Sequence, residues 1–76
     1  MNADLVIDCI GVRCPTPVIR LAKRLGEVEV GQTLAVVADD PAAAVDIPAW
    51  CRLREQEYVG VSDTDATPTY LVRRLS

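Results

Sequence analysis

The alternation of apolar and polar residues predicts a strand near the N-terminus and a helix after it. From Leu5 to Cys9 every second side chain is apolar, which is typical of a strand with one covered face. After Cys14 the apolar spacing becomes helical, with a stripe formed by Val18, Leu21, Ala22 and Leu25. Pro15 fits the first helical position, and Pro17 still lies in the first turn, where a missing N–H costs no intrahelical bond.

A second strand and a second helical segment follow. The β-branched, apolar run from Thr33 to Ala38 predicts the strand. Asp40 is a candidate N-cap, with Pro41 as the first helical residue. Pro48 interrupts the segment, so we expect a kink near Ile47 or a fresh start capped by Asp46. The second piece would run from about Pro48 to Glu57, with Trp50, Cys51 and Leu53 as its apolar positions.

Tyr58–Val61 and Thr69–Arg73 read as two strands, and the polar residues 62–68 between them predict a hairpin. The element order is therefore β-α-β-α-β-β within one domain spanning residues 1–76. Each early strand–helix–strand unit should cross over right-handedly and give parallel neighbours. We expect a two-layer α/β sandwich of the α+β type, in which two helices cover one face of a four-stranded mixed sheet.

Composition excludes several functions. The 76 residues contain no histidine and no phenylalanine, and the formal charge is −3. Histidine-dependent triads and metal sites are excluded within one chain, and a nucleic-acid partner is disfavoured by the charge and the few aromatic residues. No apolar stretch approaches the ~20 residues of a membrane span. Three cysteines without a CxxC pair cannot form a four-thiolate zinc site within one chain, and they indicate a reduced, soluble, cytoplasmic protein.

Cys14 is the candidate nucleophile. It lies in a predicted strand-to-helix turn, immediately before a helix whose first turn contains two prolines. The positive end of a helix stabilises a thiolate, and the neighbouring Arg13 adds a permanent cation. Pro15 and Pro17 stiffen the turn and so support the thiol. The alternative is that Cys14 packs as a small apolar side chain.

The segment Gly11-Val12-Arg13-Cys14-Pro15-Thr16-Pro17 resembles the Gly-x-x-Cys-Pro-x-Pro signature of the TusA/SirA family of small sulfur carriers. A second segment is also similar, with Ala38-Asp39-Asp40-Pro41 followed by Asp46-Ile47-Pro48 and Cys51. The resemblance extends from about Leu5 to Arg74. It implies an open sheet of strand order 1-2-4-3, in which the fourth strand is antiparallel to the others.

The same resemblance implies a function. Cys14 would accept sulfane sulfur as a persulfide and act as a sulfur carrier with sulfurtransferase activity. The donor would be a protein such as a cysteine desulfurase or a rhodanese-like protein, and the acceptor another protein or enzyme. Family members serve tRNA thiolation, molybdenum-cofactor assembly or sulfur oxidation. Neither a cofactor nor a membrane is implied.

Two other functions stay open at this point. One is a non-catalytic regulatory or protein-interaction module of the same fold. The other is a thiol–disulfide redox protein that uses Cys9 and Cys14, although alternation points Cys9 inward. Cys51 is expected to pack against the helix's neighbours. Exposed cations on the first helix are candidates for partner docking: Arg20, Lys23 and Arg24.

Overall fold

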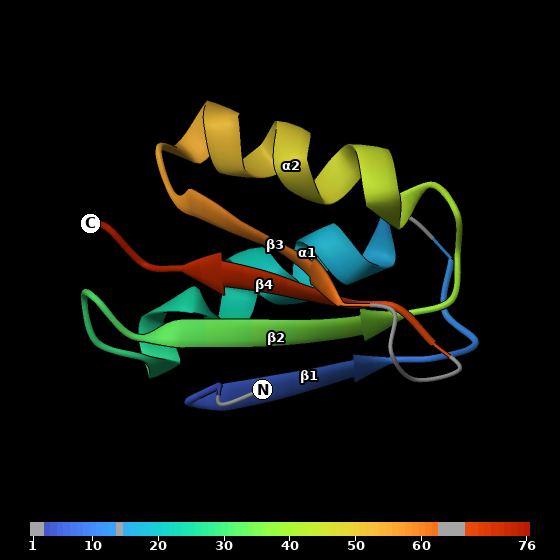
Figure 1. Ribbon diagram of the computed structural model, residues 1–76, viewed down its shortest axis with the longest axis horizontal. Helices are drawn as coiled ribbons and strands as arrows, with labels where there is room; N and C mark the ends of the chain where they lie inside the picture. Colours follow the sequence, from blue (N-terminus) through green and yellow to red (C-terminus); the bar gives the residue numbers. More distant parts are fainter. Residues whose placement is uncertain (1–2, 14, 63–66) are drawn as a thin grey trace.

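Strands and helices follow one another in the predicted order in residues 3–13, 15–62 and 67–76, which the computed structural model describes (Figure 1). The elements are β1 (Leu5–Cys9), α1 (Thr16–Arg24), the 3-10 turn η1 (Leu25–Glu27), β2 (Thr33–Ala38), α2 (Ala43–Arg54), β3 (Glu57–Ser62) and β4 (Thr69–Arg73). No helix in these ranges is long and apolar enough to cross a lipid bilayer.

The strands form one sheet of order β1-β2-β4-β3. β1 and β2 are parallel neighbours, whereas β4 is antiparallel to both β2 and β3. This confirms the order that the family resemblance implies. The expectation that both strand–helix–strand units give neighbouring strands is wrong for the second, because β4 lies between β2 and β3.

Burial explains why β4 rather than β3 occupies the inner position. Three consecutive side chains of β4 are buried, namely Tyr70, Leu71 and Val72. β3 instead exposes Val59 and Val61, as an edge strand with one poorly covered face does. The hairpin therefore places its more apolar strand inside the sheet. The turn expected at residues 63–66 lies outside the described residues.

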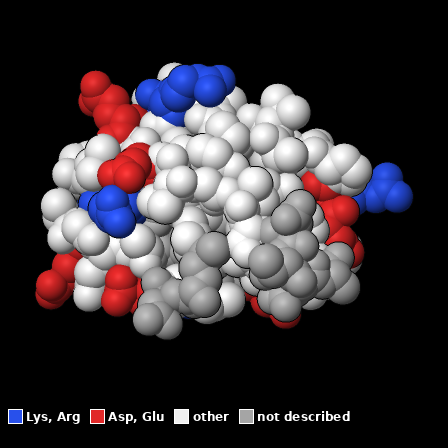
Figure 2. All heavy atoms as spheres, viewed as in Figure 1, with Lys and Arg blue, Asp and Glu red and all other residues white. Residues whose placement is uncertain are grey.

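Both helices cover the same face of the sheet, which gives the expected two layers. α1 packs on β1 and β2, α2 packs on β3 and β4, and the helices contact each other. The core between the layers contains, among others, Ile7, Cys9, Leu21, Leu34, Val36, Ile47, Cys51, Tyr70 and Val72. In the view of Figure 2, charged side chains gather toward the edges, and uncharged atoms occupy much of the middle.

α1 begins one residue later than predicted. Pro15 is its N-cap, and the first helical residue is Thr16. Pro17 is confirmed in the first turn, and its ring is buried. Leu21 is fully buried as the stripe predicts, but Ala22 is exposed. The buried ring of Pro17 therefore contributes to the apolar face of α1, which the 3.6-residue pattern alone did not reveal.

α2 is one continuous helix, so the predicted restart is wrong. Asp46 does not cap a new helix but lies within the first turn of α2. Pro48 is inside the helix and cannot donate to the carbonyl of Ala44 four residues earlier. Because Ala44 is exposed, water can satisfy that carbonyl. The predicted start is also wrong, because α2 begins at Ala43 with Ala42 as its N-cap and without a side-chain cap. The Asp40 carboxylate instead accepts a hydrogen bond from the Ala42 N–H at 3.0 Å, in the turn before the helix.

The end of α2 also differs from the prediction. The helix ends at Arg54, because Glu55 adopts a left-handed conformation with φ of 57°. The Gln56 N–H then donates to the carbonyl of Cys51 and closes the last turn. Leu53, expected on the apolar face, is 78% exposed. The helix therefore ends three residues earlier than expected, and β3 begins at Glu57.

Candidate functional site

The site is built where the carboxyl ends of β1 and β2 lie side by side. The two strands are parallel, with Cys9 opposite Ala38 in the register. The segments that leave these strands therefore start next to each other. Residues 10–13 lead from β1 toward α1, and residues 39–42 lead from β2 into α2. Parallel strands commonly place functional loops together at this edge of a sheet.

A carboxylate joins the two segments. The backbone N–H of Gly11 donates to both carboxylate oxygens of Asp39, at 3.0 Å and 3.2 Å. Gly11 has φ of 77°, a conformation that residues with a Cβ rarely adopt. This contact was not predicted from the sequence, since the two residues are 28 positions apart. The sequence pattern behind this contact is a glycine and an aspartate that each follow one of two strands. It predicts the contact only when those strands are known to be parallel neighbours.

An open hollow of about 440 Å³ lies between the same segments. Its lining is Gly11, Val12, Arg13, Asp39, Asp40 and Pro41. The sequence placed the cation Arg13 near the nucleophile and the aspartates in a separate part of the chain. The structure brings them to one hollow, so the charge around this loop is mixed rather than purely basic.

The start of α1 offers few free backbone donors. Pro15 and Pro17 have no N–H, and the Thr16 N–H donates to the carbonyl of Arg13 at 3.0 Å. An anion at this end of α1 would therefore feel the positive end of the helix without a hydrogen bond from residues 15–17. The next amide along the chain is that of Val18.

Cys14 itself lies outside the described residues. In the sequence it is placed between Arg13, which lines the polar hollow, and Pro15, which lines a second one. This second hollow, of about 260 Å³ between the two helices, is lined by Pro15, Val18, Asp46, Ala49, Trp50 and Leu53. Of the supporting residues, Arg13 thus lies at a charged surface and Pro15 at a mainly apolar one, whereas Pro17 is buried.

Cys9 and Cys51 are both buried, as predicted, with 0% and 1% exposure. Burial raises the pKa of the Cys9 thiol, and the nearby Arg20 guanidinium partly opposes this increase. Burial alone raises the pKa of Cys51 to about 11. Both thiols are consequently protonated and shielded at neutral pH, which is unfavourable for sulfur exchange.

The cations proposed for docking have different surroundings. Arg20 donates through Nη1 to the carbonyl of Asp8 at 3.1 Å, so it braces the end of β1. Arg24 pairs with Glu27 at 2.9 Å, and their mutual hydrogen bond raises the pKa of Arg24 and lowers that of Glu27. Lys23 is exposed on the same helix.

The fold and the loop together define a small two-layer α+β protein with a Cys-Pro-x-Pro segment at the entrance to its first helix. The model of the family described as sulfurtransferase TusA matches residues 5–74, nearly the whole chain. The chain therefore belongs to the TusA family. Members of this family are sulfur carriers and sulfurtransferases that relay sulfur to partner proteins.

Proposed function

We propose that this protein accepts sulfane sulfur on the thiol of Cys14 and passes it to a thiol of a partner protein. The observation that carries the proposal is the burial of the other two cysteines, at 0% and 1% exposure. Family chemistry needs a thiol that can meet another protein's sulfur, and Cys9 and Cys51 cannot do so in the folded state. Cys14 is the remaining cysteine, and it lies in the family motif.

Loading is a displacement at sulfur. The Cys14 thiolate attacks the terminal sulfur of a donor persulfide, a new S–S bond forms, and the donor leaves as a thiolate with the electrons of the broken S–S bond. Delivery repeats this step, with an acceptor thiolate attacking the outer sulfur and Cys14 leaving as the thiolate. Arg13 and the positive end of α1 favour the anionic form of the carrier thiol in both directions.

The partner specificity of such a carrier resides on its surface, because sulfur passes directly between thiols. We place the cationic part of the docking surface on Arg20, Lys23 and Arg24 of α1. Lys23→Glu is the cleanest test, since Arg20 also braces Asp8 and Arg24 is paired with Glu27. Transfer from a cysteine desulfurase should slow in Lys23→Glu at low salt, whereas loading from inorganic polysulfide should not change. If Lys23→Glu receives sulfur at the wild-type rate at low and at high salt, Lys23 is not part of the docking surface.

The experiment that tests the carrier function is intact mass after incubation with inorganic polysulfide. The wild type should gain one sulfur atom, roughly 32 Da, and lose it again on treatment with a reductant. Cys14→Ser should not gain it, while Cys9→Ala and Cys51→Ala should. A gain that persists in Cys14→Ser would overturn the proposal. Loss of about two protons without any gain would instead indicate an internal disulfide and a redox function.

A further inference from the structure

The bond between Asp39 and Gly11 has a particular place in the loop that precedes Cys14. Two other hydrogen bonds of residues 10–12 are local. The Ile10 N–H donates to Asp8 Oδ1, and the Val12 N–H donates to the carbonyl of Cys9. Local bonds set the shape of a turn, but they do not fix the turn relative to the rest of the sheet.

Asp39 supplies that long-range fixation. Its carboxylate projects from the residue directly after β2, and it holds the Gly11 amide with two oxygens. A hydrogen bond from an amide to a carboxylate is stronger than one between neutral groups. Val12 also packs against the core, so the loop has one apolar and one ionic anchor before Arg13.

We propose that Asp39 is a positioning residue for sulfur transfer: it fixes the Gly11–Arg13 segment that leads into Cys14. This inference rests on the proposed function of Cys14. Asp39 does not exchange sulfur itself. It limits the conformations from which the thiol is presented, and misplacement of reacting groups slows transfer even when the chemistry is intact.

The chain contains a matched control at the opposite end of the same two strands. Asp4 precedes β1, and its Oδ2 accepts a hydrogen bond from the Thr33 N–H at the start of β2, at 2.9 Å. Asp4 and Asp39 are both exposed aspartates that bind a backbone amide across the β1–β2 pair. They differ in that the Asp39 bond holds the Gly11 loop, whereas the Asp4 bond joins the starts of the two strands.

The test compares Asp39→Ala and Asp39→Asn with Asp4→Ala. Three quantities are measured for each variant: the rate of mass gain with inorganic polysulfide, the rate of Cys14 alkylation by iodoacetamide, and hydrogen exchange of the Gly11 amide. Urea midpoints report the stability of each variant. Should Asp39→Ala fail to fold, Asp39→Ser gives the same comparison, because its shorter side chain cannot span to Gly11.

Asp39→Ala should load sulfur about tenfold more slowly, alkylate at a different rate from wild type and exchange the Gly11 amide faster. Asp39→Asn keeps an acceptor oxygen and should recover most of the loading rate. Asp4→Ala should lose a similar amount of stability but load at the wild-type rate. The proposal is overturned if Asp39→Ala loads normally, if Asp39→Asn is as slow as Asp39→Ala, or if Asp4→Ala is equally slow.

A failure of the carrier function has a different signature. In that case the wild type itself gains no sulfur, or Cys14→Ser still gains it. The alkylation rate and the Gly11 exchange do not require sulfur transfer, so they still decide whether Asp39 positions the loop. If both are unchanged in Asp39→Ala, the positioning role is wrong whatever the function of Cys14.

Discussion

The two ends of the parallel pair β1–β2 are closed by similar bonds but have different surroundings. At the amino end, Asp4 binds Thr33 through both its backbone and its carboxylate. At the carboxyl end, Asp39 binds Gly11. The first bond joins the two strands where they start, whereas the second holds a loop beside an open hollow. The same type of bond therefore serves stability at one end and placement of a loop at the other.

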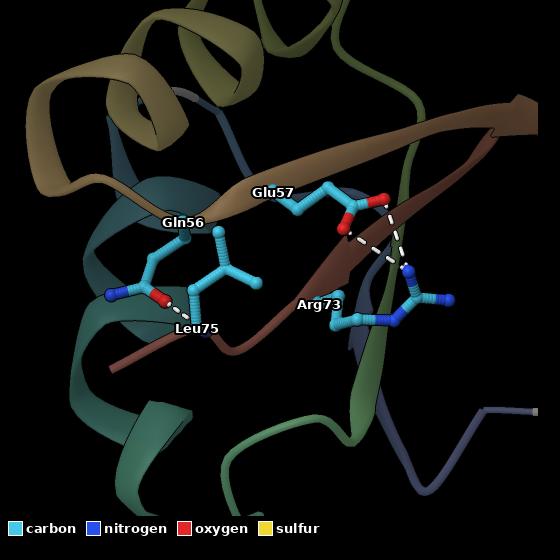
Figure 3. A network of polar contacts seen from close by, with 4 residues as sticks. All are labelled: Gln56, Glu57, Arg73 and Leu75. Carbon is cyan, nitrogen blue, oxygen red and sulfur yellow. Dashed lines mark hydrogen bonds and ion pairs between the residues drawn. The ribbon is translucent and has the colours of Figure 1, made fainter.

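Several polar links join distant segments at the amino end. The Gly31 N–H donates to the carbonyl of Arg74, and the Arg74 guanidinium donates to the carbonyl of Val28 at 2.6 Å. Figure 3 shows two more links nearby, from Arg73 to Glu57 and from Leu75 to Gln56. The chain's C-terminal segment is thus bound into this end.

The largest expected contrast is in thiol reactivity. In a brief iodoacetamide pulse, Cys14 should be labelled about 100-fold or more faster than Cys9 and Cys51, because a buried thiol reacts only after local opening. Peptide mapping of the alkylated protein measures this ratio. Unfolding in urea should make the three rates similar. Labelling of Cys9 or Cys51 first in the folded protein would show that the site is assigned to the wrong cysteine.

The next effect is a loss of folding stability at alkaline pH, which we expect to be larger for Cys51 than for Cys9. Burial at Cys51 is not offset by a described cation. Burial also raises the pKa of Tyr58, and Cys51 adds to that increase. The folded-state pKa of Cys51, about 11, lies above the ordinary value of 9.0. The protonated thiol therefore makes its full contribution to the free energy of unfolding below about pH 9. It is lost as the pH rises toward 11, by about 2 kcal/mol.

Urea unfolding of the wild type and Cys51→Ala between pH 8 and 11 measures this loss. The variant should be less stable at pH 8 but should lose less stability at high pH. Cys9→Ala is the control, and it should change the alkaline slope less, because the Arg20 guanidinium opposes the effect of burial at Cys9. Identical slopes for the wild type and Cys51→Ala would contradict the raised pKa.

A smaller effect is expected from two glycines, one near each end of the strand pair. Gly11 and Gly31 have φ of 77° and 93°, and an added Cβ meets no atom within 4 Å at either position among the described residues. Each change to alanine should therefore cost only the backbone strain, about 1–2 kcal/mol in urea unfolding. Only Gly11→Ala should also slow sulfur loading. If Gly11→Ala and Gly31→Ala both load sulfur at the wild-type rate, the conformation of the loop does not matter for transfer.

The smallest effect is expected at the ion pair of the amino end. Arg73 and Glu57 are about two-fifths exposed, so their pairing at 3.1 Å should stabilise the fold by less than about 1 kcal/mol. Glu57→Gln should lower the urea midpoint slightly, and less so at high salt, where the pair is screened. Sulfur loading should stay at the wild-type rate. A slower rate would show that the two ends are coupled.

Patterns within short segments were the most predictable part of this fold. β2 and β4 begin and end where their apolar runs predict, because strand formation and burial coincide there. Pro48 misled the interpretation of α2, since a proline's effect depends on whether the carbonyl it orphans can reach water. The helix end at Glu55 was not predictable either, because the left-handed conformation usually falls on glycine.

The site was predictable only in part, because local sequence patterns do not report contacts between distant segments. The motif around Cys14 is contiguous in the sequence, so its residues and its family resemblance were readable. Asp39 acts on Gly11 across the register of two strands, and no local pattern reports such a contact. Arg20 is a similar case, because its bond to the carbonyl of Asp8 depends on how α1 packs on β1. Long-range polar contacts need the topology first.

The C-terminal segment is bound at the amino end of the β1–β2 pair, and this determines from which side a tether or a fused domain approaches the protein. Asp4 and Arg74, near the two ends of the described chain, both belong to the end of the sheet opposite the Gly11 loop. One strand of five residues separates the two ends, roughly 16 Å at 3.3 Å per residue. A surface tether, a fluorophore or a fused domain joined after Ser76 would thus approach from the side away from the loop. Immobilised or fused forms should still exchange sulfur with large protein partners.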